Sequence, residues 1–216
     1  MRLPTSNEFT QPTFVPVRGR PAWEIAYLFP AQGHWEESDY LSIGTNHLVE
    51  FDDGCIEVLP MPTLLHQMIV RFLFKALEAH VAAHASGEVL FAPLPVRLWS
   101  GKYREPDIIY VRPKRVRKVR GQPHGADLVM EVVSEGVENR ERDLNTKPAE
   151  YARARIAEYW IVDPEAHRIT VLTLDGPTYR THGEFGRGTR ATSVLFPGFS
   201  LDVDAVFAAG EGAARK

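Results

Sequence analysis

The sequence predicts a mixed α/β (α+β) fold, in which helices flank a β-sheet, and three patterns support this fold class. An acidic turn with glycine at 52–54 separates two short apolar segments, as in a β-hairpin. Apolar residues recur at helical spacing from 64 to 81. Strand patterns at 126–134 and 158–162 enclose a helical pattern that begins near Lys147, and this strand–helix–strand unit predicts a mixed sheet.

The composition is that of an ordinary soluble domain. The chain has 216 residues, of which 44% are hydrophobic and 25% charged, so we expect one domain with a substantial core. The net charge of −3 means that any nucleic-acid binding must come from a local basic patch. The single cysteine, Cys55, excludes an internal disulfide and fits a reducing cytosol. No apolar run approaches the ~18 residues of a membrane span and no signal-peptide pattern is present, so we expect a cytoplasmic protein with no membrane partner.

The N-terminal region is rich in proline and shows little periodicity. Five prolines fall within the first 30 residues, so residues 1–35 are expected to form an extended Pro-rich arm. Apolar side chains between 23 and 29 favour docking of this arm on the domain or on a partner chain. The folded domain is expected at 36–208, followed by a flexible C-terminal tail at 209–216.

The elements of the domain follow from local patterns. A short helix is expected at 36–43, and two hairpin strands at 47–51 and 55–59. Thr63 can cap the long helix, whose apolar stripe is expected to face the core and not a cofactor. Further strand, hairpin or turn patterns occur at 88–91, 94–99, 168–174, 177–190 and 194–203.

Two carboxylates interrupt strand patterns that are otherwise apolar. Asp107 follows Pro106, which can occupy only the start of a strand, so Asp107 is expected just inside its strand. Glu131 lies within the strand pattern 126–134. If these strands pair, the two side chains can face each other. Two buried carboxylates repel unless they are paired or share a hard cation.

A lysine follows this acidic pair, near the start of the next helix. Asp107, Glu131 and Lys147 are the residue types needed to hydrolyse a phosphodiester with a divalent metal, because the carboxylates hold Mg²⁺ or Mn²⁺ and the lysine offsets charge in the transition state. Pro148 fits only the first turn of a helix, which places Lys147 near its start. Two other interpretations remain open. Asp107 could cap a turn while Glu131 pairs with an arginine, or the two could be the acid and base of a glycosidase.

Several motifs occur in a recognisable order: Pro106-Asp107, Glu131-Val132-Val133-Ser134, Asp143, Lys147 and 158–164. This series resembles the Uma-two family, bacterial restriction endonucleases of the PD-(D/E)XK nuclease superfamily. The resemblance also takes in 50–54 and 66–67, and it covers roughly residues 36–204. It implies a restriction-endonuclease-like fold and a hydrolase that uses Mg²⁺ or Mn²⁺ to cut DNA. It also implies that Asp107 and Glu131 bind the metal together with the main-chain carbonyl of Val132.

The chain departs from the superfamily pattern at one position. The lysine usually found two residues after the glutamate is Val133 here, which period-two alternation places on the same face as Glu131. The resemblance implies that Lys147, from the following helix, supplies the missing charge. The departure also keeps a second function open, that of a nuclease-fold protein that binds nucleic acid or a protein partner with little or no turnover.

Four further residues are candidates by resemblance. Glu50 would complete the metal sphere as a peripheral ligand, and His66 would orient a water or contact a phosphate. Gln67 and Asp143 belong to the same matching motifs. On the residues alone, Glu50 could equally be an exposed hairpin glutamate, and His66 a histidine held in local hydrogen bonds.

A basic segment connects the two acidic strands. Residues 112–125 carry no acidic side chain, so their cationic side chains are expected to contact the phosphates of nucleic acid without stacking on bases. An ordinary solvated loop is the alternative. A homodimer is expected from the apolar arm and from the symmetry of duplex DNA. The basic residues are Arg112, Lys114, Arg115, Arg117, Lys118 and Arg120.

Overall fold

The computed structural model describes residues 29–43, 48–115 and 121–211. Contacts divide the chain into two compact units, 1–31 and 32–216, and the helices and strands of the described residues belong to the second. Most of the predicted arm lies outside the described residues, so its docking stays a prediction. No helix within these described ranges is both long enough and apolar enough to cross a bilayer.

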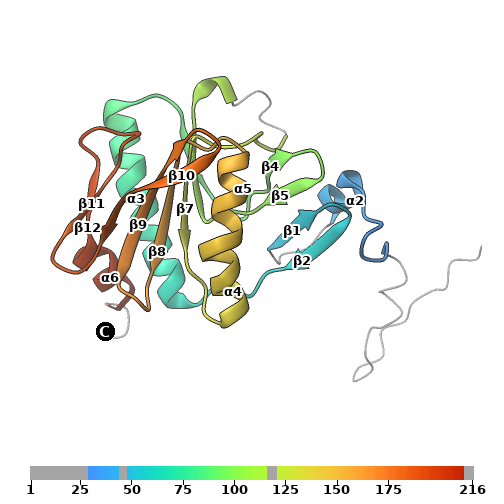
Figure 1. Ribbon diagram of the computed structural model, residues 1–216, viewed down its shortest axis with the longest axis horizontal. Helices are drawn as coiled ribbons and strands as arrows, with labels where there is room; N and C mark the ends of the chain where they lie inside the picture. The colour runs from blue at the N-terminus through green and yellow to red at the C-terminus, as the bar shows by residue number, and fades with distance from the viewer. Residues whose placement is uncertain (1–28, 44–47, 116–120, 212–216) are drawn as a thin grey trace, which may run out of the picture. The chain divides into compact units, whose positions relative to one another are not determined.

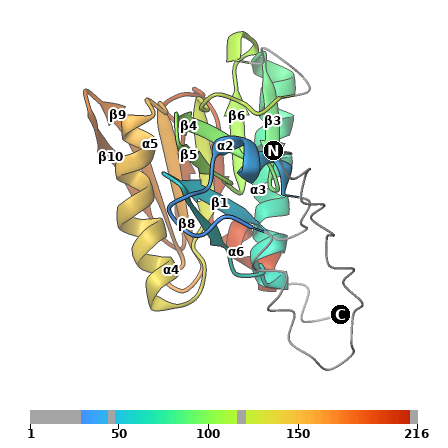
Figure 2. The same cartoon turned by 90° about the vertical axis from the view of Figure 1, so that its right-hand side faces the viewer.

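A six-stranded mixed sheet lies at the centre of the second unit (Figure 1). In spatial order its strands are β10 (Thr178–Phe185), β9 (Arg168–Asp175), β8 (Glu158–Asp163), β7 (Leu128–Val132), β6 (Ile108–Val111) and β3 (Glu88–Phe91). β7 and β8 are parallel because a helical crossover joins them, and the other neighbours are antiparallel. Figure 2 shows α4 (Val137–Glu141) and α5 (Lys147–Arg153) on one side of the sheet and α3 (Leu64–His84) on the other. The predicted fold class is confirmed.

Helix α3 forms as its sequence pattern predicts. The Thr63 side chain caps it by accepting a hydrogen bond from the backbone N–H of His66 at 3.2 Å. Its apolar stripe, which includes Ile69, Leu73 and Leu77, is buried in one cluster with the facing side chains of the sheet. The first turn of α3 therefore stands at a fixed position over the sheet, with His66 in that turn.

The crossover from β7 to β8 contains a π-helical turn. Residues Arg142–Thr146, labelled η2, separate α4 from α5. Pro148 has no N–H, and the N–H of Lys147 bonds to the carbonyl of Arg142, five positions earlier. Thr146 keeps helical dihedral angles and makes no capping hydrogen bond, so the helical path is continuous where Lys147 begins α5. This path determines which side chains of the crossover face β7.

A smaller sheet of four strands contains the predicted hairpin. Its order is β2 (Cys55–Val58), β1 (Val49–Asp52), β5 (Lys102–Arg104) and β4 (Val96–Trp99). The predicted short helix is α2 (Glu37–Ser42), whose Tyr40 ring stacks on Phe51 with the centroids 5.4 Å apart. The hairpin predicted around 52–54 is confirmed by the pairing of β1 with β2.

Strand β5 is absent from the sequence-based expectations, because charged residues flank its centre. Lys102 and Arg104 are nevertheless buried, since both pair with acidic side chains. The chain leaves the small sheet at Pro106 and enters the large sheet at Ile108. Asp107 therefore lies directly before β6, at the junction of the two sheets, and not just inside the strand as expected.

The C-terminal strands pair differently from the expected arrangement. The hairpin predicted at 177–190 is formed instead by β9 and β10, which are paired from Asp175↔Thr178 onwards. β11 (Arg190–Thr192) then pairs with β12 (Ser200–Asp202) in a separate two-stranded sheet.

A C-terminal helix, α6 (Val203–Glu211), follows β12 where the sequence pattern predicts a turn. The first residues of the predicted tail at 209–216 are therefore helical. α6 packs closely on α3, since a Cβ on Gly210 would lie 2.4 Å from the Cδ1 atom of Leu65. Glycine at this position allows the two helices to approach.

Candidate active site

The two predicted carboxylates meet at the junction of the two sheets. β6 and β7 are antiparallel with Ile108 opposite Met130, so the register continued by one residue places Asp107 opposite Glu131. Asp107 Oδ2 accepts a hydrogen bond from the N–H of Val132 at 2.8 Å. Both acids are buried, with 9% of Asp107 and 4% of Glu131 exposed. The predicted juxtaposition is present, and the assignment of both as metal ligands stays a prediction.

Lys147 reaches the acidic pair from the crossover helix. Its Nζ atom lies 2.9 Å from Glu131 Oε1 and 3.0 Å from Asp143 Oδ1. Asp143 Oδ2 accepts a hydrogen bond from the N–H of Ser134 at 3.1 Å, which ties the crossover to the end of β7. Val133 itself is buried in the apolar cluster on this face of the sheet. An ammonium group therefore reaches Glu131 from the crossover helix, and its role in place of the lysine missing at Val133 stays a prediction.

Tyr151 is a site residue that the sequence analysis missed. Its hydroxyl donates to Glu131 Oε1 at 2.6 Å. Asp143, Lys147 and Tyr151 are each four positions apart, so they lie along one face of the crossover helix. That spacing is the sequence signal that would have found the tyrosine.

Burial and neighbouring charges shift the pKa values of this cluster. The net pKa of Glu131 is raised to about 7, because burial and the charges of Asp107 and Asp143, which raise it, outweigh the charge of Lys147, which lowers it. Burial lowers the pKa of Lys147, but the charges of Glu131 and Asp143 more than offset this, so the net pKa lies above its usual value. Lys147 is therefore held in its cationic form by the two carboxylates beside it.

His66 contacts Asp107 from the first turn of α3. Its Nε2 atom lies 3.2 Å from Asp107 Oδ2, while its Nδ1 atom is buried without a hydrogen-bond partner among the described residues. Burial lowers the pKa of His66, but the hydrogen bond and charge of Asp107 outweigh it, so the net pKa is raised. Gln67, the next residue, is exposed and does not line the cavity. The structure therefore brings one of these two candidates to the site and not the other.

Glu50 is buried and is not an exposed hairpin glutamate. It is 1% exposed, it forms an ion pair with Arg104, and its Oε1 atom accepts a hydrogen bond from the N–H of Glu105 at 3.2 Å. Arg104 also binds Glu150 at 2.7 Å. Glu50 does not line the cavity that holds Asp107. Its predicted role as a peripheral ligand stays a prediction, and its observed contacts are those of a buried ion network behind the site.

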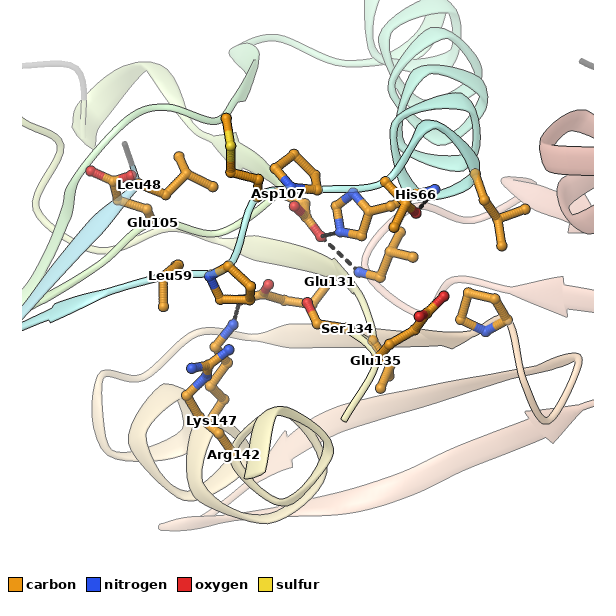
Figure 3. Close-up of a pocket in the computed structure, with 18 of the residues that line it drawn as sticks. Leu48, Leu59, His66, Glu105, Asp107, Glu131, Ser134, Glu135, Arg142 and Lys147 are labelled. Carbon is orange, nitrogen blue, oxygen red and sulfur yellow. Dashed lines mark hydrogen bonds and ion pairs between the residues drawn. The ribbon is translucent and has the colours of Figure 1, made fainter. Parts of the chain in front are cut away.

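A cavity of about 350 Å³ opens onto the acidic pair (Figure 3). Asp107, Glu131 and Lys147 line it, together with Arg142 and the apolar loop 59–62 between β2 and α3. Arg142 pairs with Glu57 at 2.7 Å and was not among the predicted site residues. The cavity thus has a cationic wall on the crossover side and an apolar wall on the loop side.

Glu105 lies at one end of this cavity, beside Leu48 (Figure 3). Its Oε2 atom is buried and has no hydrogen-bond partner among the described residues. Burial, followed by the charge of Glu50, raises the pKa of Glu105 to about 7. Figure 3 shows its carboxylate pointing away from Asp107 and Glu131, so it does not share their centre.

The described part of the basic segment lies at the opposite end of the strands from the carboxylates. It leaves β6 after Val111, whereas Asp107 precedes β6, and a four-residue strand spans about 13 Å. Asp127 holds Arg115 through Nε at 3.1 Å and accepts the N–H of Arg112 at 2.9 Å, and Lys114 is exposed. The described part of this segment therefore does not lie beside the acidic pair, because the pair sits at the other ends of the same two strands. Its contact with nucleic acid stays a prediction. Arg117, Lys118 and Arg120 lie outside the described residues.

The acidic pair offers two carboxylate oxygens to a divalent cation. Each carboxylate makes its contacts through one oxygen, Oδ2 of Asp107 and Oε1 of Glu131, and no partner is recorded for the other among the described residues. Mg²⁺ is typically held by one or two carboxylates, with waters and phosphate oxygens completing its shell. No three His, Cys, Asp or Glu side chains within the described ranges are arranged around a common metal position. That the Val132 carbonyl binds a metal, as the resemblance implies, stays a prediction.

Comparison with known proteins agrees with this fold. The model of the Uma2 (Uma-two) family, described as "Putative restriction endonuclease", matches residues 35–204. The fold is similar to that in the crystal structure of a "putative nuclease belonging to DUF820" from Anabaena variabilis. The TM-score is 0.65 at 17% identity, over 80% of this chain and 97% of that chain. None of the curated proteins compared matches the chain.

Proposed function

This chain belongs to the Uma2 family, and we propose that it is a Mg²⁺- or Mn²⁺-dependent endonuclease that hydrolyses phosphodiester bonds of DNA. The observation that carries this proposal is the convergence of Asp107, Glu131 and Lys147 in one cavity, with Glu131 and Lys147 2.9 Å apart. A phosphodiester-cleaving site needs oxygen ligands for a metal, a fixed positive charge near the phosphate and access for substrate. The two carboxylates, the Lys147 ammonium and the cavity would meet these three needs.

Each residue of the cavity has a separate task in this proposal. Asp107, Glu131 and the Val132 carbonyl would hold the cation, which when bound polarises the phosphate and makes a water more acidic. Lys147, fixed between Glu131 and Asp143, offsets negative charge that develops on the phosphate. The register of β6 and β7 keeps the ligands at a constant separation.

Two further basic side chains are placed to contact substrate. Arg142 lines the cavity with 12% of its side chain exposed, and its guanidinium is suited to a phosphate oxygen. His66 lies on the other side of Asp107 and would orient a water or contact a phosphate. Both come from helices that flank the sheet, so substrate would enter between α3 and the crossover.

The proposal extends to the partners of the protein. The basic segment would hold the DNA backbone away from the cut site, because its described residues, Arg112, Lys114 and Arg115, lie at the far end of the strands. A homodimer and a cytoplasmic location complete the proposal, as expected for an enzyme that cuts duplex DNA.

A second function is binding to nucleic acid or to a protein without turnover. Val133 at the usual lysine position favours it, as does the arrangement of only two acidic side chains at the candidate metal position among the described residues. The two functions predict different effects of Mn²⁺, which would be needed for cleavage and not for binding.

The test is cleavage of supercoiled and linear DNA with Mg²⁺ or Mn²⁺, comparing the wild type with Asp107→Asn. The variant keeps the side-chain volume and removes the charge, so it should fold and lose metal-dependent cleavage. Circular dichroism checks the fold. Equal cleavage by the two proteins would assign the activity to another site or to a contaminant, and binding without cleavage by the wild type would favour the second function.

A further inference from the structure

Among the described residues, the hydroxyl of Tyr151 has one polar partner, the carboxylate of Glu131. Tyr151 is 0% exposed and its ring packs edge-on against Tyr159 at a centroid distance of 5.0 Å. A phenylalanine would fill the same apolar space, so the packing alone does not require a hydroxyl. A buried hydroxyl needs a hydrogen-bond partner, and this one donates to Glu131 Oε1 at 2.6 Å.

Two donors from successive helical turns therefore meet on the same oxygen. Lys147 Nζ lies 2.9 Å from Glu131 Oε1, and the Tyr151 hydroxyl lies 2.6 Å from it. The last torsion of a glutamate side chain is broad, so a single donor would leave the carboxylate free to exchange its two oxygens. Lys147 also pairs with Asp143 at 3.0 Å, so its ammonium does not bind Glu131 exclusively. The second donor removes this freedom.

We propose that Tyr151 is a positioning residue that fixes the Glu131 carboxylate by its Oε1 atom, so that Oε2 is presented to a divalent cation in the cavity. This inference rests on the proposed function. Groups that orient a metal ligand commonly change metal affinity by about 10- to 100-fold when they are removed. The same range is expected for the hydroxyl of Tyr151.

The test is Mn²⁺ titration of the full chain by calorimetry, with Tyr151→Phe compared to the wild type. The variant should bind Mn²⁺ about 10- to 100-fold more weakly, and the Mn²⁺ concentration for half-maximal cleavage should rise by the same factor. At saturating Mn²⁺ its cleavage rate should approach that of the wild type, because the ligands and Lys147 remain. A loss of packing alone would not produce this separation between metal requirement and maximal rate.

Tyr179→Phe is the matched control. Its hydroxyl donates to the main-chain carbonyl of Ile156 at 2.9 Å, and its ring contacts Tyr159 from the other side of the aromatic cluster. Tyr179→Phe removes a hydroxyl from a tyrosine near Tyr151 without touching Glu131, so it should leave the Mn²⁺ affinity unchanged. Wild-type affinity in Tyr151→Phe would overturn the inference while the proposed function stood. A wild-type protein that binds no Mn²⁺ would overturn both.

Discussion

Replacing Lys147 by methionine tests whether its ammonium compensates the buried acids. Methionine keeps much of the side-chain length and removes the charge, leaving Glu131 and Asp143 without their common cation at 2.9 and 3.0 Å. All three side chains are at most 5% exposed. Removing one partner of a buried ion pair typically costs about 3–5 kcal/mol, because the remaining charge is uncompensated. We expect a loss in this range at pH 8.

The loss should also depend on pH, with a sign that the structure fixes. Without Lys147 the pKa of Glu131 rises further, since the charge of Lys147 is what lowers it in the wild type. At pH 5 the carboxyl would then be protonated, and a neutral group costs less to bury. The free energy of unfolding lost by Lys147→Met should therefore be smaller at pH 5 than at pH 8.

The assay is urea unfolding followed by circular dichroism at both pH values. Arg168→Met is the control, because Arg168 pairs with Glu184 at 3.5 Å with both side chains more than half exposed. Such exposed pairs contribute up to about 1 kcal/mol. A loss below 1 kcal/mol for Lys147→Met at pH 8, equal to that of the control, would refute the reasoning that Lys147 compensates the buried acids.

Two other predictions concern Glu105 and the basic segment. The pKa of Glu105 is raised from its usual 4.5 to about 7, so between these values the folded state holds a proton that the unfolded state has lost, and the stability contributed by this residue falls as pH rises through that window. Urea unfolding of Glu105→Gln should show a flatter decline between pH 5 and 8, and superimposable profiles would contradict the assigned shift. Lys114→Ala should weaken DNA binding equally for all sequences and lower the slope of log affinity against log salt by about 1. Arg168 is an exposed cation outside the segment, so Arg168→Ala should leave the salt dependence of DNA binding unchanged. Equal slopes for the wild type and Lys114→Ala would show that Lys114 does not contact DNA.

Local patterns predicted much of this fold because local chemistry determines it. The turn at 52–54 and the Thr63 cap fix the hairpin and the start of α3 through contacts within a few residues. The meeting of Asp107 and Glu131 was predictable because the two apolar strand patterns pair directly, although Asp107 lies just before β6 and not within it. The approach of Lys147 to the acidic pair was expected from its position near the start of the next helix and from the family pattern.

The features that the sequence did not predict depend on partners that are distant along the chain. β5 is buried because Lys102 binds Asp52 and Glu150, each at 2.7 Å, and no local pattern marks a lysine as a core residue. Glu50 is buried for the same reason, through Arg104. The location of the described part of the basic segment is set by strand direction. It follows the C-terminal end of β6, whereas Asp107 precedes the N-terminal end of the same strand.

The most direct test of the metal centre is a Mn²⁺ soak of crystals, with diffraction measured at a wavelength where manganese scatters anomalously. We predict one peak between Asp107 and Glu131, about 2.0–2.6 Å from one oxygen of each, with Lys147 still bound to Glu131. No anomalous peak at saturating Mn²⁺, with Asp107 still paired with His66, would contradict a cation shared by the two carboxylates. The protein would then have a nuclease fold without metal-dependent cleavage.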